Sequence, residues 1–183
     1  MRAQMPSKIQ IKLFASEDIP VEHYVPVFHR WIRESVLKET LIDVVNYTHV
    51  ADGPAIVLIG HETDYALDRT GKKLGLLVSH KRGAPIDFRQ ALARAARAAK
   101  LLESEPELAS PIRFRTDELV LRIADRLNAP NTDETYERLL PELRAAFEPV
   151  YGAGLELARV GAPRELFTVR VRGTKAATLA ELA

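Results

Sequence analysis

Short turns, rather than helices, join most of the strand-like segments of this chain. Four early segments have the alternating apolar and polar residues, or the β-branched residues, that are typical of strands; they cover 8–14, 41–50, 55–62 and 72–80. The last three follow one another without an intervening helix. Parallel strands need a long crossover after almost every strand. The spacing therefore predicts an α+β fold with a mainly antiparallel sheet, and it argues against a doubly wound parallel sheet.

Three segments have the apolar spacing of amphipathic helices, at 21–37, 87–104 and 131–151. Asp87 stands where a residue capping the second of these helices is expected. We expect about three helices packed on one face of the sheet. Extended segments follow each helix, so the chain can be interpreted as repeated helix-plus-hairpin units. The alternative is that the recurring Gly, Asn and Pro residues mark ordinary turns.

Residues 112–124 are expected to be extended. Their apolar residues change parity near Thr116, which predicts a bulge or a tight hairpin. A short helix starting at Asp117 is the alternative. A final hairpin is expected from 154–160 and 165–172.

The length of 183 residues and the composition, 46% apolar and 28% charged, are those of one globular domain. We assign this domain to 8–172, with a disordered N-terminus at 1–7 and a flexible C-terminal tail at 173–183. The absence of Cys excludes disulfides, thiol nucleophiles and Cys-based metal sites. No apolar run is long enough to cross a membrane, and the N-terminus lacks the pattern of a signal peptide. We expect a cytoplasmic protein.

The densest group of polar residues follows the most apolar strand, at His61, Glu62 and Asp64. Loops at strand ends often carry function. His61 could act as a base that Glu62 or Asp64 orients, or His61 and Asp64 could bind a divalent metal together with the distant His49 or His80. The alternative is a solvated hairpin loop.

A second group lies at His80 and Arg82, between a strand and the helix at 87–104. A basic loop before a helix N-terminus suits a phosphate or carboxylate, although the glycine spacing of a P-loop is missing. We include Arg113 and Arg115 among these candidate ligand-binding residues. The alternative is a solvated turn.

The charge along the chain is uneven even though the formal net charge is only +1. Segment 81–100 has six Lys and Arg against one Asp, whereas 101–150 has eleven acids against six Arg. This split suits an acidic partner, pairing within the chain, or a homodimer. We assign a partner surface to Arg89, Arg97, Lys100 and Trp31, since Trp31 lies off the expected apolar stripe of its helix; the alternative is that Trp31 covers the edge of the core.

The leading hypothesis is a non-catalytic domain that binds a protein partner or a small anionic ligand. One alternative is a small metal- or His-dependent hydrolase that uses His61, Glu62 and Asp64. A second is weak nucleic-acid binding through the basic segment 81–100. We assign no metal ligands and expect no cofactor and no membrane partner.

Overall fold

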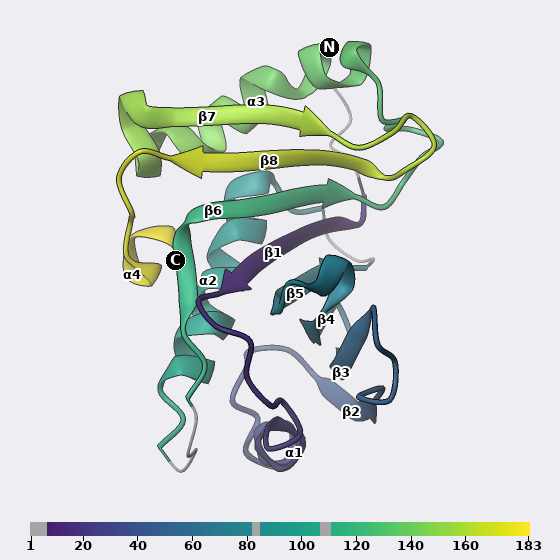
Figure 1. The fold of residues 1–183 in the computed structure, drawn as a ribbon, viewed down its shortest axis with the longest axis vertical. Coiled ribbons are helices and arrows are strands. Elements are labelled where there is room, and N and C mark those ends of the chain that lie inside the picture. Colours follow the sequence, from purple (N-terminus) through teal and green to yellow (C-terminus); the bar gives the residue numbers. More distant parts are fainter. Residues whose placement is uncertain (1–6, 82–84, 107–110) are drawn as a thin grey trace.

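The computed structural model describes residues 7–81, 85–106 and 111–183. The described chain has helices and one eight-stranded sheet, which confirms the predicted α+β class (Figure 1). Every strand pair in the sheet is antiparallel, in the order β2-β3-β4-β5-β1-β6-β8-β7. The strands are β1 (Ile9–Ala15), β2 (Leu41–Asn46), β3 (Pro54–Gly60), β4 (Thr63–Asp68), β5 (Gly75–His80), β6 (Phe114–Ile123), β7 (Leu155–Val160) and β8 (Phe167–Gly173).

The helices are α1 (Tyr24–Glu34), α2 (Phe88–Glu103), α3 (Asp133–Tyr151) and α4 (Leu179–Leu182), with two short 3₁₀ turns at Thr70–Lys72 and Gly152–Gly154. Helix α2 packs on β1 and β5, α1 packs on β2 and β3, and α3 packs on β7. In the view of Figure 1, α2 and α3 lie behind the sheet. The repeated units and the packing of all helices on one face stay predictions.

Strand β1 lies between β5 and β6, and its residues pair with both strands. Its alternate residues Ile9, Ile11 and Leu13 are buried. Ile11 lies opposite Val78 on one side and Leu121 on the other. The period of two that identified this strand in the sequence therefore continues across the sheet as a row of buried apolar side chains.

Helix α2 begins where the sequence indicates. The carboxylate of Asp87 accepts a hydrogen bond from the backbone N–H of Gln90, and the side chain of Gln90 accepts one from the backbone N–H of Asp87. This capping box satisfies two N–H groups that would otherwise lack partners. Five alanines, at positions 91, 95, 96, 98 and 99, are buried on the helix. They let its backbone lie close to the sheet.

The structure corrects one prediction about the strands. The sequence predicts a loop at His61, Glu62 and Asp64, but only His61 and Glu62 form the turn, and Thr63 already begins β4. Strand β4 pairs with β3 on one side and β5 on the other. The polar stretch after β3 is thus a tight hairpin that leads into an interior strand of the sheet.

Strand β6 carries the predicted irregularity. Its register against β1 shifts between the pair Leu13–Leu119 and the pair Ala15–Phe114. The segment is one strand with a bulge, so the alternative of a helix starting at Asp117 is wrong.

Both ends of the described chain contact the domain. The hydroxyl of Ser7 donates to Asp125. At the other end, Leu182 of α4 is buried, and Arg89 of α2 donates to the backbone carbonyls of Glu181 and Leu182. The division into an N-terminal segment, one domain and a flexible tail stays a prediction, and residues 1–6 lie outside the described residues. None of the described helices combines the length and the apolar character needed to cross a bilayer.

A buried ion pair joins the middle of the sheet to the β4–β5 connection. Nζ of Lys12 lies 2.6 Å from Oδ2 of Asp68, and both side chains are at most 2% exposed. Asp68 also accepts hydrogen bonds from the backbone N–H and the hydroxyl of Thr70, and Lys12 donates to the Thr70 carbonyl. Burial lowers the pKa of Lys12, although its contact with Asp68 acts in the opposite direction. Because each charge has several partners, the pair can stay inside the sheet.

We predict that Asp68→Ala lowers the free energy of unfolding by about 3–5 kcal/mol, because it leaves the Lys12 ammonium buried without a counter-charge. Adding Lys12→Met should recover most of that loss, since the unpaired charge is then gone. Urea unfolding of the wild type, both single variants and the double variant gives the four free energies. Additive effects of the two substitutions would contradict the proposed coupling.

Candidate functional site

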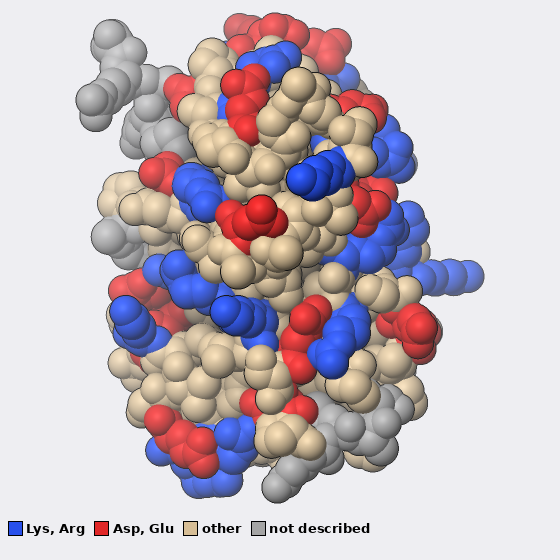
Figure 2. All heavy atoms as spheres, turned by 90° about the vertical axis from the view of Figure 1, so that its left-hand side faces the viewer, with Lys and Arg blue, Asp and Glu red and all other residues tan. Residues whose placement is uncertain are grey.

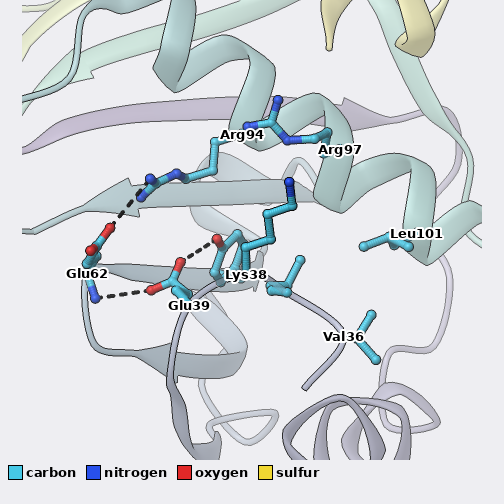
Figure 3. Close-up of a pocket in the computed structure, with 9 residues that line it drawn as sticks. Val36, Lys38, Glu39, Glu62, Arg94, Arg97 and Leu101 are labelled. Atoms are coloured by element: carbon cyan, nitrogen blue, oxygen red, sulfur yellow. Dashed lines mark hydrogen bonds and ion pairs between the residues drawn. The ribbon is translucent and has the colours of Figure 1, made fainter. Parts of the chain in front are cut away.

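A pocket of about 470 Å³ lies where three parts of the chain meet (Figure 3). The segment that follows α1 supplies Val36, Leu37, Lys38 and Glu39, the β3–β4 hairpin supplies Glu62 and Tyr65, and α2 supplies Arg94, Arg97 and Leu101. The volume falls in the range of small-molecule sites.

The carboxylate of Glu39 holds one side of this pocket together. Its Oε2 accepts hydrogen bonds of 3.0 Å from the backbone N–H groups of Glu62 and Thr63, and its Oε1 accepts one of 2.6 Å from the hydroxyl of Tyr65. The carboxylate thus occupies the inside of the β3–β4 turn. Gly60 leaves room for it, because a Cβ there would lie 2.7 Å from Oε2 of Glu39 and 2.4 Å from the Thr63 carbonyl.

Tyr65 links the pocket to the core. Its side chain is 3% exposed, and only its hydroxyl reaches a polar partner. Burial, and then the hydrogen bond to Glu39 and the negative charge of that carboxylate, raise the pKa of the Tyr65 phenol well above its ordinary value. The phenol therefore remains a hydrogen-bond donor to Glu39 over the physiological pH range.

Arg94 joins α2 to the same hairpin. One guanidinium nitrogen lies 3.5 Å from a carboxylate oxygen of Glu62. Another donates to the hydroxyl of Thr63 and lies 3.4 Å from Nδ1 of His80. The guanidinium thus connects the ends of β4 and β5 to the middle of α2.

Two further cations, Lys38 and Arg97, stand at the rim of the pocket. Both residues are exposed, and within the described part of the chain neither has an ion pair with an acid. Figure 3 shows the ammonium of Lys38 extended toward α2, on the side where Arg97 emerges. Since like charges repel, this arrangement favours an anion between them.

Only part of the first predicted group belongs to the pocket. Glu62 and His80 both reach Arg94, so the structure brings these two residues together. His61 is exposed, and its backbone N–H donates to the carbonyl of Thr40. Asp64 forms an ion pair of 2.9 Å with Lys81. Because successive side chains on a strand alternate, Asp64 points to the face opposite Thr63 and Tyr65.

The other predicted ligand-binding residues lie elsewhere. Arg113 is exposed and donates to the carbonyl of Glu103. Arg115 pairs with Asp117 in β6, with N–O distances of 3.1 and 2.8 Å. Arg82 lies outside the described residues.

Of the proposed partner surface, only Arg97 lines the pocket. Lys100 is exposed on α2, and Arg89 is engaged with α4. Trp31 is fully buried and its indole N–H donates to Glu105 at 2.7 Å, so its side chain offers no surface to a partner. The structure therefore places Trp31 within the core-facing stripe of α1, with Tyr24, Val27 and Phe28, and corrects the expectation that it lies off that stripe.

Sequence reasoning did not select Lys38, Glu39, Tyr65 or Arg94 as site residues. Glu39 and Tyr65 are 26 residues apart, and Arg94 is 31 residues from Thr63. The only sequence signal was the run of basic residues on α2, which includes Arg94 but does not say what it contacts.

Among the described residues, no three His, Asp or Glu side chains come together as ligands of one metal ion would.

Charges of both signs are mixed over the side of the molecule in Figure 2, where groups of Lys and Arg lie next to Asp and Glu. Several cations of the basic segment have partners within the chain, as Arg89 and Arg94 show.

Neither models of known protein families nor curated proteins give a match to this chain. The geometry of the pocket is therefore the observation that bears on function.

We predict that Glu39→Ala lowers the free energy of unfolding by about 1–3 kcal/mol, because it leaves the buried hydroxyl of Tyr65 and two backbone N–H groups without an acceptor. Adding Tyr65→Phe to this variant should cost less than Tyr65→Phe costs alone, since its partner is already gone. Thermal or urea unfolding of the four proteins measures this coupling.

Glu137→Ala is the matched control, because Glu137 is an exposed glutamate on α3. Its effect should be small. An effect of Glu39→Ala no larger than that of this control would show that the carboxylate does not hold the hairpin.

Proposed function

We propose that this chain binds a small anion in the pocket between α2, the β3–β4 hairpin and the segment after α1. The supporting observation is that Lys38 and Arg97 stand together at its rim without an acidic partner among the described residues. Both acids of the pocket are already engaged, since Glu39 accepts three hydrogen bonds and Glu62 faces Arg94. An incoming anion would therefore meet two available cations.

The site is preorganised for this task. Glu39 fixes the backbone beside Lys38, and Arg97 extends from a regular helix three residues after Arg94. Because the backbone at both cations is ordered before binding, only the two side chains lose conformational entropy when the ligand arrives. A small ligand suits this open, concave pocket better than a flat protein surface would.

We do not propose the hydrolase alternative, because His61 and Asp64 do not line the pocket. It keeps the cytoplasmic location and the non-catalytic role that were expected from the sequence. The homodimer and nucleic-acid binding stay predictions without a supporting contact in the described chain.

The test is an NMR titration of the ¹⁵N-labelled protein with acetate and with inorganic phosphate at low, constant ionic strength. We expect at least one of them to shift the amide signals of Lys38, Glu39 and Arg97 in a saturable way. Lys38→Gln and Arg97→Gln should each weaken binding about twofold to fivefold, the loss expected when one solvent-exposed ion pair is removed.

Arg164→Gln is the control, because it removes one exposed cation far from the pocket in sequence and leaves the net charge equal to that of the two test variants. Its affinity should match the wild type. Equal weakening in all three variants would mean that net charge alone attracts the anion, and the proposed site would be wrong.

A further inference from the structure

The charges of the pocket limit how many negative charges its ligand carries. Three cations line it, Lys38, Arg94 and Arg97, against two acids, Glu39 and Glu62. The pocket therefore has one positive charge in excess. A ligand with a single negative charge neutralises this excess, whereas a dianion would leave one charge uncompensated beside two carboxylates.

The pocket also has an apolar end. Val36, Leu37 and Leu101 are half-buried and pack at the edge of the core. In Figure 3, Glu62 and Arg94 lie at one end, Val36 and Leu101 lie at the other, and Lys38 and Arg97 lie between them. A ligand whose anionic group meets the two cations can thus place an apolar body against Val36 and Leu101.

The helix ends do not favour a phosphate. Arg94, Arg97 and Leu101 belong to the middle and the last turn of α2, and Val36 follows the C-terminus of α1. Phosphate sites commonly use the backbone N–H groups and the positive end of a helix N-terminus. Here the donors available to an anion are the side chains of Lys38 and Arg97.

We propose that the ligand is an amphiphilic monocarboxylate, with its carboxylate at Lys38 and Arg97 and its aliphatic or aromatic body against Val36, Leu37 and Leu101. This inference rests on the proposed anion-binding function and names the ligand class of the same pocket. A carboxylate suits Arg97 in particular, because guanidinium and carboxylate groups are both planar and pair through two hydrogen bonds.

The experiment compares probes that differ in one property at a time, by NMR titration at constant ionic strength. Acetate, butanoate and hexanoate share the charge and differ in apolar length. Hexan-1-ol keeps the length without the charge, and hexyl phosphate keeps the length but adds a second negative charge near neutral pH. We expect affinity to rise about threefold to fourfold for each methylene that enters the pocket. We expect hexanoate to bind more tightly than both hexan-1-ol and hexyl phosphate.

Two variants separate the two ends of the site. Arg97→Gln should weaken acetate and hexanoate by the same factor, because it removes a contact to the carboxylate only. Leu101→Ala should leave acetate unchanged and reduce the gain from acetate to hexanoate. Leu127→Ala is the matched control, since Leu127 is 90% exposed and does not line the pocket.

The outcomes distinguish this inference from the function on which it rests. If acetate or inorganic phosphate binds at Lys38 and Arg97 but chain length has no effect, or if hexyl phosphate binds more tightly than hexanoate, the ligand class is wrong and the anion site stands. If hexan-1-ol binds as well as hexanoate, the pocket is an apolar site and both proposals are wrong. If none of the anions binds, the proposed function itself is overturned.

Discussion

One carboxylate connects the parts of this molecule that form the pocket. Glu39 accepts hydrogen bonds from two backbone N–H groups of the β3–β4 turn and from the hydroxyl of Tyr65. Through these contacts the segment after α1 is attached to the sheet, and Lys38 is placed next to α2. Because both oxygens of Glu39 accept hydrogen bonds from the hairpin, neither of them pairs with the cations at the rim. Glu39 and Glu62 have partners within the pocket, whereas Lys38 and Arg97 have no acidic partner among the described residues. This difference is the basis of the anion-binding proposal.

The fold class could be predicted because it depends on local patterns. Ile9, Ile11 and Leu13 alternate with polar residues, and short connections without an α-helix join β2, β3, β4 and β5 to one another. Strand β4 itself was missed because Asp64 and Asp68 give its sequence the polarity of a loop. The structure shows how these acids are tolerated, since Asp68 pairs with Lys12 and Asp64 pairs with Lys81. The partner of Asp68 is 56 residues away in the sequence, so no local pattern could reveal it.

The site could be predicted only in fragments, for the same reason. Glu62, His80 and Arg97 were singled out from separate polar stretches, and the structure relates all three to the pocket or to Arg94. The residue that organises them, Glu39, stands alone between a helix and a strand and carries no motif. For Trp31 the sequence predicted a side chain on a partner surface, whereas the structure has a buried one. Its indole N–H donates to Glu105, 74 residues away, and the whole side chain can therefore be buried. Long-range polar contacts decided both cases.

The most direct test of this account is a crystal structure of the protein grown with ω-bromohexanoate, in which the anomalous signal of bromine marks the apolar end of the ligand. The account predicts a bromine peak beside Val36 and Leu101, with carboxylate density between Lys38 and Arg97. A bromine peak elsewhere, or a pocket without ligand density at concentrations well above those that hexanoate needs to bind, would contradict it.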